Sequence, residues 1–153
     1  ISATEPVTAA AKVTNDGDGD QADFALVNAS VPMNVSAIAV PDHATAQVSV
    51  TNTSDDDRTA TLTSYNGDGD IVEQSDLTIR AGASTTIELA DINDGDVAAV
   101  SLADPDQSMV WNIRVSQKDV SDAKLAGVSV IGATDLKEAR EQVWSNQNMT
   151  IVR

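Results

Sequence analysis

The sequence predicts an all-β fold, an Ig-like antiparallel β-sandwich of about seven to nine strands with a short C-terminal helix. Three observations support this prediction. Short runs alternate apolar and polar residues, as strands with one buried face do. Clusters of Asn, Asp and Gly separate the runs and predict turns. The acidic residues are mostly Asp, which favours turns and loops over helices.

The clearest pattern lies in residues 46–90, which we interpret as a β-meander of four strands in a row. Its alternating runs are Ala46–Thr51, Thr59–Thr63, Asp76–Arg80 and Thr86–Leu89. Among the separators, Asn66-Gly67 is a strong hairpin signal because both residues tolerate positive φ. One face of this meander has to be covered by a second sheet, so the pattern favours a sandwich over a single sheet.

The chain before the meander predicts an arm followed by the start of the domain. Residues 1–20 have little periodicity, and we expect an extended arm or linker with one strand near Ala10–Thr14. Residues 21–153 are then a single sandwich domain. Its first strands are predicted at Ala22–Ser30, with Phe24 and Leu26 directed inward, and at Val35–Val40.

The chain after the meander predicts three more strands, Val97–Ala103, Met109–Gln117 and Leu125–Ile131. Trp111 in the second of them is the expected largest core side chain. Asp135 and Glu138 then have the spacing of a capping box, which predicts a short helix through about residue 144. Residues 149–152 are compatible with a final strand.

Composition excludes several classes of function. The formal net charge is −15, which argues against binding to nucleic acid or to an anionic membrane. The chain has no Cys, which excludes disulfides and cysteine zinc sites. No apolar run is long enough for a membrane helix, so we expect no membrane insertion within this sequence. Because the chain begins at Ile1 rather than Met, we expect any signal peptide or anchor to lie outside it.

Residues 46–131 contain a series of short apolar motifs. It consists of Val48-x-Val50-Thr51-Asn52, Ala60-x-Leu62, Ile79-x-Ala81-Gly82, Ile87-x-Leu89, Val97–Val100 and Trp111-x-Ile113-Arg114. This pattern resembles a family of uncharacterised exported proteins that we associate with the cell envelope of actinobacteria. The resemblance implies Ig-like modules outside the cytoplasm. It implies no catalytic residues, because that family has no established activity.

The Asp-rich turns are the candidate metal sites. Alternating acids in a Gly-rich loop can supply oxygen ligands to calcium, which makes Asn66, Asp68 and Asp70 the candidate ligands. The spacing fails the EF-hand template, which requires Gly at the sixth loop position and an acid at the twelfth. A solvated hairpin turn is the plainer interpretation. The same alternatives apply to Asp16–Asp20 and to Asp55–Asp57.

No catalytic constellation stands out. His43 is the one histidine, and no Gly-x-Ser-x-Gly motif accompanies it, so we interpret it as a loop residue and predict no enzymatic activity. The four aromatic residues, Phe24, Tyr65, Trp111 and Trp144, are too scattered for a strong carbohydrate-binding platform. Four Asn-x-Ser/Thr sequons, at Asn28, Asn34, Asn52 and Asn148, matter only in a pathway that glycosylates Asn.

The sequence therefore predicts a non-catalytic structural or interaction module of an exported cell-envelope protein. We expect an unidentified protein or envelope partner, recognised by a sheet edge or by the Asp-rich loops, and a monomer or weak dimer. The first alternative is a calcium-dependent binding or adhesion module. A further alternative is a surface-layer fragment of a salt-loving organism, since acids far outnumber bases.

Overall fold

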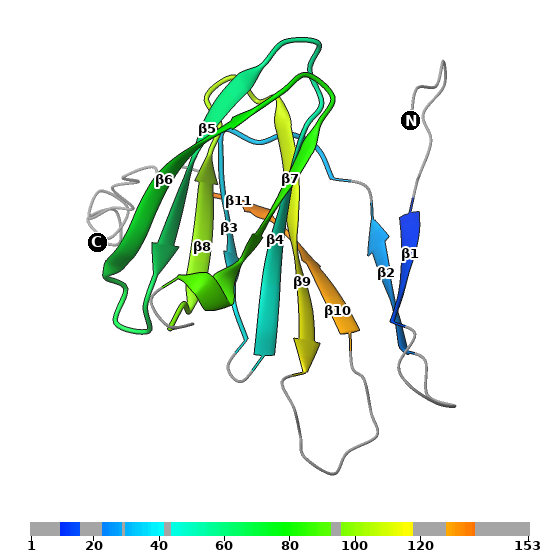
Figure 1. The fold of residues 1–153 in the computed structure, drawn as a ribbon, viewed down its shortest axis with the longest axis vertical. Coiled ribbons are helices and arrows are strands. Elements are labelled where there is room, and N and C mark those ends of the chain that lie inside the picture. The colour runs from blue at the N-terminus through cyan, green and yellow to red at the C-terminus, as the bar shows by residue number, and fades with distance from the viewer. Residues whose placement is uncertain are drawn as a thin grey trace, which may run out of the picture.

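Two antiparallel sheets lie face to face in the computed structural model of this chain (Figure 1). The structure describes residues 10–15, 23–28, 30–41, 44–92, 96–117 and 128–136. One sheet has four strands in the order β10-β9-β4-β7, and the other has five strands in the order β11-β3-β8-β5-β6. This arrangement confirms the predicted all-β sandwich.

The strands of the sandwich follow the alternating runs of the sequence. The five-stranded sheet contains β3 (Val35–Ala39), β5 (Arg58–Tyr65), β6 (Ile71–Ile79), β8 (Ala99–Ala103) and β11 (Thr134–Asp135). The four-stranded sheet contains β4 (Ala44–Asn52), β7 (Ser84–Glu88), β9 (Met109–Gln117) and β10 (Val128–Gly132). A short 3-10 helix, η1 (Leu89–Asp91), follows β7.

The expected β-meander is wrong, although its four runs are strands. Of the consecutive pairs in residues 46–90, β5 and β6 are the two that hydrogen-bond to each other. β4 pairs instead with β7 and β9, its neighbours in the four-stranded sheet. The chain changes sheet after β4 and again after β6. Alternation of apolar residues reports which face of a strand is buried, and it does not report which strand lies alongside.

The core fills the space between the sheets. β4 contributes Val48 and Val50, and β9 contributes Ile113 and Trp111, whose side chain is 2% exposed. The prediction of Trp111 as a large core side chain is confirmed. The Trp111 indole N–H donates to the Ser36 hydroxyl at 2.7 Å. Burying Trp111 therefore leaves its polar atom paired, which is the condition for a Trp to contribute its large apolar area to stability.

A separate hairpin precedes the sandwich. β1 (Ala10–Asn15) pairs with β2 (Asp23–Asn28) in a two-stranded sheet of its own, and β2 lies against β10. The strand expected near residue 10 is therefore present within the predicted arm; the division at residue 20 stays a prediction. Leu26, expected to point inward, is 67% exposed. The predicted strand is present as β2, but the inward direction expected for Leu26 is wrong, because the hairpin stands outside the two sheets.

The C-terminal helix is not present among the described residues. Asp135, the expected N-cap of this helix, is extended in β11 and pairs with Ser36 of β3. Most of the predicted helix and the expected strand at 149–152 lie outside the described residues. Within the described part of the chain, no helix has the length and apolar character needed to cross a membrane.

Candidate interaction surface

The predicted site residues Asn66, Asp68 and Asp70 form the turn between β5 and β6. The Asn66 Oδ1 atom accepts hydrogen bonds from the backbone N–H groups of Asp68 at 3.1 Å and Asp70 at 2.9 Å. The Gly69 N–H donates to the Asn66 carbonyl at 3.1 Å, with a φ of 86° at Gly69 that suits glycine. The turn is therefore closed by its own atoms.

This geometry gives the three predicted ligands different roles. The Asn66 amide oxygen faces two backbone N–H groups, which occupy its lone pairs. The Asp68 and Asp70 side chains are exposed. Calcium requires six or more oxygens to converge, and within the described residues no group of three or more His, Cys, Asp or Glu side chains could hold a metal ion. Calcium binding by this turn stays a prediction.

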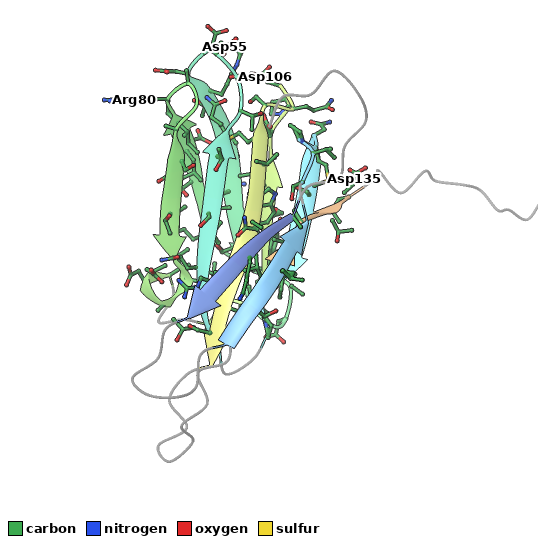
Figure 2. The ribbon with its side chains drawn as sticks, turned by 90° about the vertical axis from the view of Figure 1, so that its right-hand side faces the viewer. Asp55, Arg80, Asp106 and Asp135 are labelled. Carbon is green, nitrogen blue, oxygen red and sulfur yellow. The ribbon has the colours of Figure 1, made fainter. Side chains whose placement is uncertain are left out.

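The acids at the other end of the sandwich contact the protein itself. Asp55, Arg80 and Asp106 all lie at this end (Figure 2). The Arg58 guanidinium pairs with the Asp106 carboxylate at 3.4 Å and also with Asp56 at 3.3 Å. Asp57 accepts a hydrogen bond from the backbone N–H of Ala81 at 3.0 Å. These contacts tie three loops together, so Asp56 and Asp57 have a structural role.

Asn52 is a fully buried polar side chain that holds this loop end together. Its Nδ2 group donates to the carbonyls of Asp56 at 2.8 Å and Ile79 at 3.0 Å, and its Oδ1 atom accepts from the Ser54 N–H and hydroxyl. The sequence analysis identified Asn52 as part of a sequon and did not predict its burial. A signal was available, because position 52 continues the inward phase of Ala46, Val48 and Val50.

Asp104 is the second buried polar side chain that the sequence analysis missed. It is fully buried, and its Oδ2 atom accepts from the backbone N–H groups of Ser108 at 2.6 Å and Met109 at 2.7 Å. The Asp104 N–H donates to the Asn34 carbonyl at 2.7 Å. The same signal was available, since residue 104 continues the inward phase of Val100 and Leu102. Two backbone donors to one carboxylate oxygen satisfy this buried charge.

Several other candidates contribute no site. Tyr65 is half-buried, and its hydroxyl lies 3.2 Å from that of Ser101 on the outer face of the five-stranded sheet. Trp111 is in the core. Asp16–Asp20, His43 and Trp144 lie outside the described residues, as does the side chain of Phe24.

The two sides of the sandwich differ in whether their edge strands are covered by other parts of the chain. On one side the chain passes from β10 to β11 through Ala133 and so joins the two sheets, and the β1–β2 hairpin lies beside β10. On the other side, in the part of the chain that the structure describes, β6 and β7 have no strand beyond them. β6 is nine residues long and β7 is five. The longer of the two open edges is therefore β6 (Figure 1).

A row of polar pairs on the outer face fixes the orientation of the β6 backbone. The side chains of Thr78, Asp76 and Gln74 hydrogen-bond to the directly opposed Thr59, Thr61 and Thr63 at 2.9, 2.8 and 3.0 Å. Such close approach is typical of the pairs in an antiparallel ladder that exchange no backbone hydrogen bonds. In those pairs the backbone N–H and C=O point away from the partner strand. We infer that Gln74, Asp76 and Thr78 present these groups at the open edge.

A family model described as a family of unknown function, DUF5719, matches residues 1–90. The matched region includes the β5–β6 hairpin and the loop end held by Asn52. No curated protein matches the chain, and no solved structure matches it.

Proposed function

Since the chain belongs to DUF5719, a family of unknown function, we propose its function from the sandwich itself: it is a non-catalytic interaction module with the β6 side as its recognition surface. The observation that carries this proposal is the contrast between the two sides. The β10–β11 side is bridged by the chain, whereas β6 ends its sheet without a further strand among the described residues. An unpaired edge of this length is a template for an added strand.

Strand addition supplies a simple mechanism. The sandwich holds β6 in a fixed, extended shape, so the edge needs no ordering when a partner binds. The partner gains backbone hydrogen bonds from Gln74, Asp76 and Thr78, and the surrounding side chains determine which sequences fit. The rigid core thus positions the surface and takes no direct part in recognition.

The location outside the cytoplasm is also part of this proposal. It is supported by the resemblance of residues 46–131 to Ig-like modules of exported envelope proteins. The excess of acids over bases, which gives a net charge of −15, is compatible with a solvated surface module. The partner in that setting is a protein segment that can become extended.

The proposal is tested by selecting a displayed library of random peptides on the immobilised protein. We compare the wild type with the Thr78→Pro variant, which removes an N–H from the open edge and leaves the ladder with β5 in place. Thr78→Val is the matched control, because it keeps the N–H and the β-branched shape. Thermal melts verify that all three proteins are folded.

We expect peptides that the wild type and Thr78→Val both retain and Thr78→Pro loses. Thr86→Pro on β7 measures the contribution of the shorter open edge in the same experiment. If the folded wild type and the two Pro variants retain the same peptides, recognition does not use these edges and the proposed function is wrong.

A further inference from the structure

We propose that the outer face of the five-stranded sheet binds residues 137–153 of the same chain. This face is separate from the open β6 edge, so it gives the module a second contact surface. Three observations point to it: an uncharged patch on the face, the place where the chain leaves β11, and the composition of the segment that follows.

Three neighbouring strands of this sheet present an outer face without charge. Ala37 of β3, Ser101 of β8 and Thr63 of β5 lie in one row, each directly opposed to the next. Because side chains alternate along a strand, this row identifies the other outward positions. Those of β3 and β8 are Val35, Ala37, Ala39, Ala99, Ser101 and Ala103, and β5 adds Thr side chains and Tyr65. We call these outward positions the uncharged patch.

The outer face of the other sheet differs. Arg114 of β9 and Glu88 of β7 point outward there, with Gln47 of β4 between them, and the Gln47 amide donates to Glu88. Polar and charged side chains are usual on a sheet face that meets water. Among the described strands of the five-stranded sheet, the charged outward residue is Asp76, on the edge strand β6. The uncharged patch is therefore better suited to contact with another segment than to water.

The chain passes from the described residues at the border of this patch. Thr134 of β11 is directly opposed to Ala37, and the Leu136 N–H donates to the Val35 carbonyl at 2.9 Å. By the same alternation, Leu136 lies on the outer face together with Thr134. Its side chain is 50% exposed. The next segment therefore starts beside the patch, with an apolar side chain already on that face.

Residues 137–153 lie outside the described residues, and their composition differs from that of the rest of the chain. They contain three of the nine Lys and Arg residues but only two of the 24 Asp and Glu residues. Their apolar residues include Val143, Trp144, Met149, Ile151 and Val152. Charge complementarity favours contact between this segment and the acidic remainder of the chain. The distance from β3 to β5 is about 10 Å, which a segment of this length can span.

The test places a nitroxide spin label on the patch and reads its effect at Trp144. The chain has no Cys, so a single introduced Cys is labelled uniquely. The label is attached to Ala39→Cys, at an exposed outward position of β3. The control is Thr86→Cys, at an exposed outward position of β7 in the other sheet. The full chain carries fluorinated tryptophan, so that Trp111 and Trp144 each give a fluorine NMR signal, and thermal melts verify that both proteins are folded.

We expect the label at position 39 to remove most of the Trp144 signal and the label at position 86 to leave it. Chemical reduction of the nitroxide should restore the signal. A charge in the patch should release the segment, because an unpaired charge is costly to cover. Adding Ala103→Asp to the labelled Ala39→Cys protein should therefore restore at least half of the Trp144 signal, whereas adding Thr86→Asp should not.

The other outcomes overturn the proposal. If the label at position 39 leaves the Trp144 signal of the folded protein unchanged, or if both labels reduce it equally, the segment does not bind this face. A mixture of labelled protein without fluorine and fluorinated protein without Cys tests for a second copy. Loss of the Trp144 signal in that mixture would mean that another molecule supplies the segment. Neither label lies on β6, so peptide selection on the Ala39→Cys protein tests the proposed function separately.

Discussion

Two Asp-rich regions lie at opposite ends of β5, and their side chains differ in how they contact the rest of the molecule. At the loop end, Asp57 accepts a hydrogen bond from the backbone N–H of Ala81 in another loop, and Asp106 pairs with Arg58. Asp104 accepts from backbone N–H groups within its own loop. At the hairpin end, Asp68 and Asp70 are exposed, and the turn is closed by the Asn66 side chain instead. The same residue type thus stabilises the fold at one end and remains available to solvent at the other.

The difference comes from what the backbone offers nearby. Three loops that connect the two sheets meet at the loop end, namely those after β4, β6 and β8. Where they meet, side chains of one loop pair backbone groups of another: Asp57 accepts from the Ala81 N–H, and Asn52 donates to the Ile79 carbonyl. The hairpin at the other end connects neighbouring strands of one sheet, so its turn satisfies its own backbone. Acids there have no structural task and are available for recognition.

The largest effect of a substitution on stability is therefore expected at Asn52. The Asn52→Ala variant removes the donor of the buried hydrogen bond to the Ile79 carbonyl and of the part-buried one to Asp56, which should cost roughly 2–4 kcal/mol of unfolding free energy. Chemical denaturation of the variant measures this loss. The control is Asn112→Ala, which truncates a half-buried Asn on the outer face of β9 and should cost far less. Equal losses in the two variants would contradict the role given to Asn52.

The second-largest effect is expected at Asp104. The Asp104→Ala variant leaves the buried N–H groups of Ser108 and Met109 without an acceptor, and we expect it to lose about 2–3 kcal/mol. Asp104→Asn keeps one side-chain oxygen and should lose about 1 kcal/mol, within the range for exchanging a charged acceptor for a neutral one. Denaturation curves of the two variants check this order. If the Asn variant is as unstable as the Ala variant, the predicted order is wrong. A neutral oxygen of the same size would then be unable to replace the carboxylate of Asp104.

The elements of this comparison differ in how far the sequence predicts them. The alternation Met109, Trp111, Ile113, Val115 predicts β9 with the bounds that the structure has. The hairpin predicted at Asn66-Gly67 is present, but the positive φ lies at Gly69 and Asn66 closes the turn with its side chain. Both features belong to residues within the turn. Local patterns of this kind are set by the chain's own stereochemistry and are visible without knowledge of the fold.

The loop end is beyond such local patterns. Asn52 and Asp104 are buried because they continue the inward phase of β4 and β8. The Asp104 carboxylate bonds within its own loop, to Ser108 and Met109, whereas Asn52 also reaches Ile79 and Arg80, far along the chain. These long-range contacts depend on which sheet each strand joins, and the periodicity of apolar residues does not carry that information. The β4–β7 pairing, which replaced the expected meander, is the step that brings Asn52 beside Ile79 and Arg80. The candidate ligands of the hairpin, in contrast, lie in a single turn that the sequence predicts.

A smaller effect on stability is expected within the hairpin turn. Asn66→Ala removes the two side-chain hydrogen bonds to the backbone and should lower the free energy of unfolding by about 1 kcal/mol. Asn66→Asp keeps an oxygen at the same position and should retain most of that stability. Thermal melts of both variants measure the difference. A loss at Asn66 as large as the loss at Asn52 would mean that the turn is not self-contained.

The smallest effect is expected when the exposed acids of the hairpin are changed. The Asp68→Asn and Asp70→Asn double variant should melt at the temperature of the wild type or slightly above it, because it relieves repulsion in a chain with a net charge of −15. The same melts with millimolar calcium and with chelator test the calcium alternative. A ligand that binds only the folded state raises the melting temperature. A rise with calcium in the wild type that disappears in the double variant would make this turn a cation site. Because the Asn66 oxygen faces two backbone N–H groups, we expect any rise to be the same in both proteins.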